Sequence, residues 1–396
     1  MKNTSPTAIL LNVGHLMDHW VLAAFAYTWF QIAAAWGTQW TELTPYNFGA
    51  TFMFGTGSIL AGRLGDLWGR RIMMIIFFAG MGVSCLLIAL CSTPWQIGTA
   101  LTLMGAFASI YHPVGIPMLV QKAEKPGFTI GVNGVAGNMG IAIAAGGSVY
   151  LAETYGWQMA YVVPAAVCLV SALLFMIYAP KEEEAPAKRK PKMTKLPPAV
   201  MARVFMVMTV TAVTGSIVFS ATTNGNGELI RERFRGVVES PQALGVMLFT
   251  IFMLASLAQL VVGKLLDRYP LKKIYLPILF MQVPLLLLAS QSYGWMLYVA
   301  AVGYMLFVFG AIPFTDSMIV KYIDDRMRSR VTGMRLAVGL GLSSLVVATL
   351  GPSVKAAGFT TLLIALAGVA ACSFVAILFL PDEEIAEAPA QATPAA

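Results

Sequence analysis

Two long apolar segments are joined by Gly62-Arg63-Leu64-Gly65-Asp66-Leu67-Trp68-Gly69-Arg70-Arg71. A weaker copy, Gly263-Lys264-Leu265-Leu266-Asp267-Arg268-Tyr269, lies about 200 residues further on and again follows a second long apolar segment. Two copies in equivalent places indicate two equivalent halves. In the first copy, Gly62 and Gly65 allow helices to approach closely, and Asp66 can pair with a helix N-terminus across the loop.

The composition predicts a membrane protein. The chain is 58% hydrophobic and 11% charged, whereas an ordinary soluble domain has about 25% charged residues. A transmembrane helix needs about 20 mostly apolar residues, and twelve segments meet this requirement. They are residues 8–36, 45–66, 72–92, 95–121, 127–152, 157–179, 200–222, 241–265, 273–291, 293–320, 329–354 and 357–380. We therefore predict an all-α membrane protein with twelve transmembrane helices in two six-helix bundles.

A charged, proline-rich stretch after residue 180 separates the first six segments from the last six. We predict an N-terminal bundle (1–180), a solvated cytoplasmic linker (181–199), a C-terminal bundle (200–380) and a disordered cytoplasmic tail (381–396). Lys and Arg concentrate in the linker and in the loops on the same side, so both termini should be cytoplasmic in a multi-pass protein of the bacterial inner membrane. The net charge of +7 mostly reflects this topology, and no nucleic-acid partner is expected.

All three histidines lie inside apolar segments: His15, His19 and His112, with Asp18 between the first two. Ionisable side chains in hydrocarbon cost several kcal/mol unless they pair or face water, and they often mark ion or substrate pathways. His15, Asp18 and His19 share one helix face at spacings of three and four residues. We predict that the four residues couple protons or bind substrate. The structural alternative is that His15 or His112 is a buried hydrogen-bonding residue between helices.

Two histidines and one aspartate at this spacing could also bind a divalent metal. Few other acids lie inside the apolar segments to complete such a site, so no metal and no cofactor is predicted. The remaining candidates are polar residues that could reach a cavity or a gate. They are Asn133, Asn138 and Tyr27 for the cavity, and Asp316 with Arg335 for a structural or gating pair, or alternatively a substrate-anion site.

The first loop sequence resembles the signature Gly-x-Leu-x-Asp-x-x-Gly-Arg-Arg of the major facilitator superfamily, and the resemblance extends over about residues 8–380. It implies a two-bundle transporter whose central cavity opens alternately to each side of the membrane. It also implies a cytoplasmic gate formed by Gly62, Asp66, Gly69, Arg70 and Arg71, with Asp267 at the equivalent position of the second copy. That second copy lacks the downstream Gly-Arg pair.

A narrower resemblance is to the fosmidomycin-resistance branch, whose members are regarded as drug exporters driven by proton antiport. Its members carry His-x-x-Asn-Asp in the first helix, whereas this chain has Asp18-His19, which moves the acid about 100° around the helix. Gly146-Gly147 stands where antiporters carry Gly-Pro. The resemblance is carried by His15-Leu16-Met17, Tyr111-His112-Pro113 and Gly134-Val135-Ala136-Gly137-Asn138-Met139-Gly140.

The sequence has no Walker loop, Gly-x-Ser-x-Gly or His-Glu-x-x-His motif, so we do not expect an enzyme, and active transport must use an ion gradient. We predict a monomeric proton-coupled antiporter that exports a small organic compound, with the bilayer, protons and this compound as its partners. The alternatives are proton-linked uptake of an organic acid or another metabolite, and a non-transporting membrane sensor.

Overall fold

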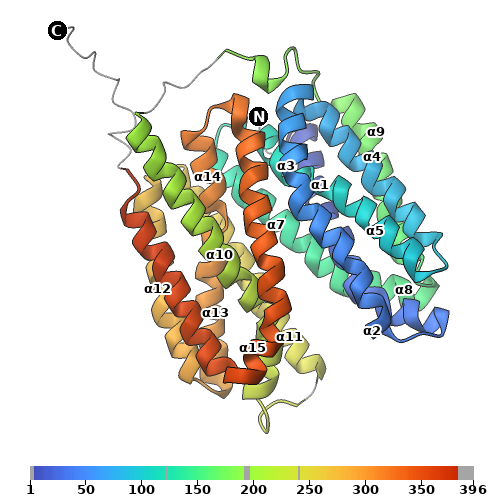
Figure 1. Ribbon diagram of the computed structural model, residues 1–396, viewed down its shortest axis with the longest axis vertical. Coiled ribbons are helices and arrows are strands. Elements are labelled where there is room, and N and C mark those ends of the chain that lie inside the picture. Colours follow the sequence, from blue (N-terminus) through green and yellow to red (C-terminus); the bar gives the residue numbers. More distant parts are fainter. Residues whose placement is uncertain (1–3, 122, 191–196, 240, 382–396) are drawn as a thin grey trace. The chain divides into compact units, whose positions relative to one another are not determined.

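The computed structural model describes residues 4–121, 123–190, 197–239 and 241–381, and these residues form helices and connecting turns (Figure 1). The predicted tail beyond residue 381 lies outside this range. The chain divides into two compact units. The first unit comprises residues up to 190 together with 325–341, and the second comprises the intervening residues up to 324 together with those from 342 onward.

Most of the first unit is built from helices of the N-terminal half. A π-helical turn, Tyr111–Gly115, joins α5 to α6, and a second one, Ala144–Ser148, joins α7 to α8. The helices are α1 (Pro6–Trp36), α2 (Trp40–Leu43), α3 (Phe48–Trp68), α4 (Arg70–Ala89), α5 (Pro94–Ala108), α6 (Ile116–Val120), α7 (Pro126–Ile143), α8 (Val149–Tyr155) and α9 (Met159–Tyr178).

The second unit holds α10 (Pro198–Arg233), α11 (Pro241–Leu266), α12 (Leu271–Gln291), α13 (Gly294–Ala311) and α14 (Pro313–Tyr322). The last helix, α15 (Arg328–Leu378), begins in the first unit and continues in the second. It is interrupted at Gly358, which adopts φ 75° and ψ 166°, a conformation that favours glycine. This kink lies next to the predicted boundary between the last two segments.

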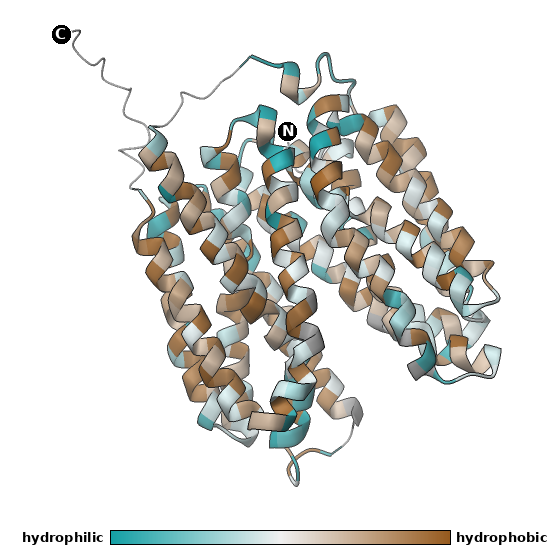
Figure 2. Cartoon of the chain, viewed as in Figure 1, coloured by the Kyte–Doolittle hydropathy of each residue, from teal (hydrophilic) through white to brown (hydrophobic). Residues whose placement is uncertain are grey.

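Each of the twelve predicted segments coincides with a helix or with consecutive parts of one. Among the described residues, ten helices are long and apolar enough to cross a membrane. The other two predicted segments correspond to α3 and to the first part of α15. Figure 2 shows hydrophobic residues along the lengths of the helices and many hydrophilic ones near their ends.

The seventh apolar segment was predicted for about residues 200–222, and α10 continues beyond it to Arg233. The last turns of α10 are polar, and they stay helical because their side chains bind partners inside the second unit. Tyr304 donates a hydrogen bond to Asn226 at 2.6 Å, and the buried Arg233 donates one to Thr360 at 2.7 Å. The Arg233 guanidinium also lies 4.0 Å from the centre of the Tyr293 ring.

Glycines allow close contacts between helices of the first unit. A Cβ atom on Gly140 of α7 would lie 2.2 Å from the Leu16 carbonyl oxygen of α1, and one on Gly105 of α5 would lie 2.2 Å from that of Ala50 in α3. Small residues at such points let helix backbones approach one another. The contact between α1 and α7 matters most here, because α1 carries two of the three histidines.

We predict that Gly140→Ala lowers the unfolding temperature of the detergent-solubilised protein, because its methyl group would have to push α1 away from α7. Overpacking of this kind costs about 1–3 kcal/mol. The matched control is Gly146→Ala in the following turn, where a Cβ atom would meet nothing within 4 Å. Equal unfolding temperatures for the two variants would contradict the proposed contact.

Candidate functional site

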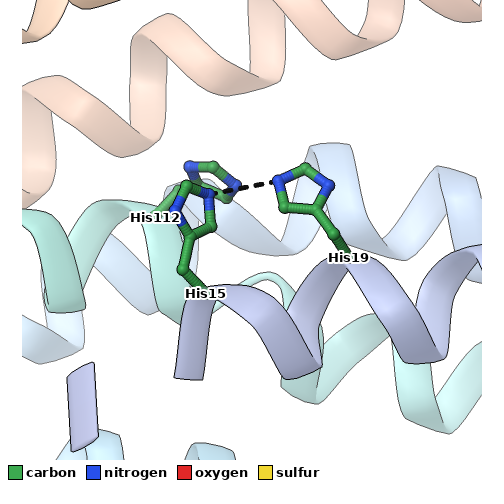
Figure 3. A group of neighbouring side chains, drawn as sticks. All are labelled: His15, His19 and His112. Atoms are coloured by element: carbon green, nitrogen blue, oxygen red, sulfur yellow. Dashed lines mark hydrogen bonds between the residues drawn. The ribbon is translucent and has the colours of Figure 1, made fainter. Parts of the chain in front are cut away.

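The three histidines lie together in the first unit. His15 and His19 stand one turn apart on α1, and His112 comes from the turn between α5 and α6 (Figure 3). The Nε2 atoms of His15 and His19 are 3.1 Å apart. The His112 ring centre lies 4.9 Å from that of His15 and 5.5 Å from that of His19. One ring nitrogen from each residue lies within 4.8 Å of the others, so the three could serve as ligands of a single ion.

The π-helical turn Tyr111–Gly115 places His112 in this group. Pro113 has no backbone N–H, so the regular helix hydrogen-bond pattern cannot continue through it. Single π-helical turns of this kind are frequent at functional sites. Gly115 leaves room for the turn, because a Cβ atom there would lie 2.9 Å from Cε2 of the Tyr111 ring.

Asp18 is fully buried beside the histidines. Its Oδ2 atom lies 3.5 Å from Nε2 of His112, and within the described part of the chain neither carboxylate oxygen accepts a hydrogen bond. An ionised carboxylate without donors is costly in an apolar interior. The pair avoids an uncompensated charge either with a proton on Asp18 and a neutral His112, or with an ionised Asp18 beside a cationic His112.

His15 is held by a network of buried hydrogen bonds. Its Nδ1 atom lies 2.6 Å from the Asn133 carbonyl oxygen, which can only accept, so Nδ1 donates. The Asn133 amide in turn donates to the Tyr111 hydroxyl at 2.7 Å and to Asn12 at 2.9 Å. The Tyr111 ring stacks on His15 at 4.9 Å between ring centres. One nitrogen of His15 therefore has a structural role, while Nε2 faces the other histidines.

Tyr111 and Asn12 were missed as site residues from the sequence. The only signal was the position of Tyr111 directly before His112. Asn133, which was predicted for a cavity, supports His15 through its backbone and Tyr111 through its side chain. Asn138 on α7 and Tyr27 on α1 are half-buried, and their role in a cavity stays a prediction.

Arg335 and Asp316 belong to different units. Arg335 is half-buried in the part of α15 that belongs to the first unit, and its charge lies within electrostatic range of His112. Asp316 is buried on α14 in the second unit. A pair between them stays a prediction.

A second polar cluster surrounds the loop between α3 and α4. Asp66 accepts a hydrogen bond from the backbone N–H of Arg330 at 2.9 Å and so caps the start of α15. A Cβ atom on Gly62 would lie 2.3 Å from the Ser329 carbonyl oxygen, so glycine permits this approach. The fully buried Arg70 donates to Asp325 through two hydrogen bonds, of 2.8 Å to Oδ1 and 2.7 Å to the backbone oxygen.

Asp325 joins this cluster to the segment after α9. Its second oxygen accepts a hydrogen bond from Arg189 at 2.6 Å, and Arg189 also pairs with Glu182 at 2.9 Å. Burial works against the ionised form of Asp325, but the guanidinium groups of Arg70, Arg328 and Arg189 outweigh it and hold the pKa of this carboxyl below its usual value. The first part of the predicted linker therefore makes specific contacts with the first unit, while Lys181, Glu183 and Glu184 of this stretch are exposed, and its role as a solvated cytoplasmic linker stays a prediction.

The other predicted gate residues make different contacts. Arg71 caps the end of α9 by donating to the carbonyl oxygens of Ala179 at 2.9 Å and Met176 at 2.6 Å. Gly69 has φ 103°, which favours glycine between α3 and α4. Asp267 follows α11 and is half-buried, and a role equivalent to that of Asp66 stays a prediction.

The second unit carries an apolar groove of about 710 Å³ between α11, α12 and α13. Its lining includes Leu254, Leu257 and Val261, with Lys273 as a charged neighbour. Such a surface suits hydrocarbon chains better than a polar substrate. The histidine cluster is therefore the stronger candidate site.

Comparisons with known proteins agree with this architecture. A model of the Major Facilitator Superfamily matches residues 10–227 and 204–395. The multidrug resistance protein MdtG of Escherichia coli (strain 536) is 24% identical over 299 residues, which cover 72% of this chain and 71% of MdtG. The puromycin resistance protein pur8 of Streptomyces alboniger is 29% identical over 138 residues, or 34% of this chain and 26% of pur8.

Solved structures show the same fold at low sequence identity. The human organic anion transporter MFSD10 matches with a TM-score of 0.71 and 15% identity, covering 94% of this chain and 99% of that protein. The fucose:proton symporter FucP of Escherichia coli matches with a TM-score of 0.69 and 17% identity, covering 95% and 98%. These similarities support the twelve-helix fold and carry no information on substrate.

We predict that Asp325→Asn destabilises the protein by about 3 kcal/mol at neutral pH, because buried Arg70 loses its closest ionised partner at 2.8 Å and, among the described residues, keeps only the Asp66 carboxylate at 3.7 Å. The measurement is thermal unfolding in detergent. The matched control is Glu183→Gln, which removes an exposed carboxylate from the same region. An unfolding temperature equal to that of the control would show that the cluster does not stabilise the unit.

The same substitution gives a pH dependence. Because the pKa of Asp325 is lowered by folding, its contribution is fully present above the unfolded pKa, near 3.9, and is lost as pH falls through the folded value. The stability difference between wild type and Asp325→Asn should therefore narrow only below about pH 4. A difference that already disappears near neutral pH would contradict this assignment.

Proposed function

The chain belongs to the major facilitator superfamily, and from this membership we propose that it is a proton-coupled antiporter that exports a small organic compound. Members of this superfamily are secondary transporters and not enzymes. The protein is accordingly a multi-pass membrane transporter. The proton coupling, the direction of transport, a bacterial inner-membrane location and cytoplasmic termini are parts of the proposal.

The observation that carries the proposal is the buried contact between Asp18 and His112. These groups can exchange one proton without changing the net charge of the pair, and Asp18 has no hydrogen-bond donor in the described structure that would hold it permanently ionised. Binding or release of a proton changes the net charge of the apolar site and so favours one arrangement of the surrounding helices over another. Intramembrane acids and histidines are typical of proton-coupled transporters.

His15 and His19 extend this pair into a possible proton path. Since Nδ1 of His15 donates to the Asn133 carbonyl, Nε2 of a neutral His15 carries a lone pair. The Nε2 atom of His19, at 3.1 Å, must then donate to it. His19 and His112 are partly exposed, whereas His15 is buried, so the first two can exchange protons or contact a compound.

The cluster around Asp66 and Arg70 is proposed as the cytoplasmic gate. It holds the start of α15 on the first unit, and α15 then runs into the second unit. Breaking and reforming these contacts would accompany alternating access. Export rather than uptake is supported by the names of MdtG and pur8, which are described as multidrug and puromycin resistance proteins.

Proton-linked uptake of an organic acid is the second candidate. The specific observation in its favour is the positive charge of Arg335 within electrostatic range of His112. A cationic group beside the site would favour an anionic substrate. The direction of proton movement relative to the compound separates the two candidates.

We predict that Asp18→Asn abolishes compound-driven proton movement in proteoliposomes, because the amide cannot bind and release the proton. The compounds to test include puromycin and fosmidomycin, and internal pH is the readout. The matched control is Glu42→Gln, which removes an exposed acid and should retain coupling. Antiport predicts that protons move opposite to the compound. Normal coupling in folded Asp18→Asn would refute the role of this pair, and movement in the same direction would favour uptake.

A further inference from the structure

The geometry points to a second ligand for the same cluster: we propose that His15, His19 and His112 bind a divalent transition-metal ion of the Zn²⁺ class. A role of the metal ion in transport would rest on the proposed function, whereas metal binding itself does not. The binding itself depends on three imidazoles that surround one point. A bound ion would replace the proton between His15 and His19 and would need His112 in its neutral form, so metal ions and protons would compete for these imidazoles.

The nitrogen positions are close to those that a metal ion requires. Zinc–nitrogen bonds are about 2.0–2.1 Å long, which places two tetrahedral ligands about 3.3 Å apart. The Nε2 atoms of His15 and His19 are already 3.1 Å apart. The third nitrogen, from the partly exposed His112, lies within 4.8 Å of the other two and has to move closer for one ion to bind all three.

The surroundings of His15 resemble those of a metal ligand. Metal-binding histidines usually donate their second ring N–H to a carbonyl or carboxylate oxygen, which fixes the ring and the tautomer. His15 does so through Nδ1 to Asn133, with the Tyr111 ring stacked on its face. Gly137 adds a third constraint, because a Cβ atom there would lie 2.7 Å from Nε2 of His15. The Nε2 lone pair is therefore held in one direction before any ion arrives.

Asp18 supplies the charge that a dication needs in an apolar interior. Its carboxylate is fully buried, lies 3.5 Å from Nε2 of His112 and accepts no hydrogen bond from the described residues. One negative charge beside the cluster offsets half of the charge of the ion. The partial exposure of His19 and His112 leaves a fourth coordination position for water or for a donor group of a compound.

The donor types select the class of metal. Imidazole nitrogen suits Zn²⁺, Co²⁺, Ni²⁺ and Cu²⁺, whereas Mg²⁺ and Ca²⁺ prefer oxygen ligands. The sequence argument against a metal considered two histidines and one aspartate on a single helix. It did not include His112, which the turn between α5 and α6 brings to the same point.

Co²⁺ is the probe that tests the inference, because four-coordinate Co²⁺ absorbs visible light. The full-length protein is purified with a histidine-free tag, so that its three histidines are the only ones present. We expect one Co²⁺ per chain, displaced by Zn²⁺. His19→Gln and His112→Gln should each weaken binding at least about tenfold. Size-exclusion profiles and metal-free unfolding temperatures establish that the variants are folded.

Two further variants complete the test. Cys372→Ser removes an exposed thiol and should leave binding unchanged. Asp18→Asn should abolish proton coupling yet keep a bound Co²⁺, with reduced affinity, because the ligands are imidazoles. Binding that is absent, or that folded histidine variants retain at full strength, would overturn the metal site whatever the outcome for proton coupling. Histidine-dependent binding together with normal coupling in Asp18→Asn would refute the proposed function and leave the metal site standing.

Discussion

A polar group buried among apolar helices has to find its partner within the protein, because apolar side chains and, within the membrane, lipid chains offer none. This constraint accounts for the main contacts of the first unit. Buried Arg70 binds Asp325, Asp66 caps the start of α15, and the Asn133 amide bonds Tyr111. Apolar side chains supply most of the buried core, and these polar pairs join segments that are far apart in the sequence.

Asp18 departs from this rule. Its neighbours in the described structure provide no hydrogen-bond donor to either oxygen, and its nearest charged partner is a histidine whose charge depends on a proton. A buried acid with such a partner is stable only when a proton or another cation is present. A bound cation would remove the free-energy cost of burying the uncompensated Asp18 carboxylate. This is why Asp18 marks the candidate site.

Hydropathy alone was enough to predict the helical fold, because each segment has to cross the same thickness of hydrocarbon. Helical spacing also predicted the shared face of His15, Asp18 and His19, and the loop motif predicted that Asp66 can cap a helix. Hydropathy and helical spacing could not predict the contacts between segments that are far apart in the sequence. Nothing in the sequence around Asp325 or Arg189 indicates that folding brings the two together. Likewise, α10 extends past residue 222 because its polar residues form hydrogen bonds with residues of other helices.

The histidine cluster combines one fixed ligand with two adjustable ones. Asn133, Tyr111 and Gly137 hold His15 in a single orientation, whereas His19 and His112 are partly exposed. Because the His15 ring is already held in place, little conformational entropy is lost when its Nε2 atom binds a proton or a metal ion. Adjustable neighbours then allow the same site to hold a proton at a short nitrogen–nitrogen distance or a metal ion at a slightly longer one. The glycines of α7 make this possible, because only a residue without a Cβ atom lets the helix approach the imidazoles so closely.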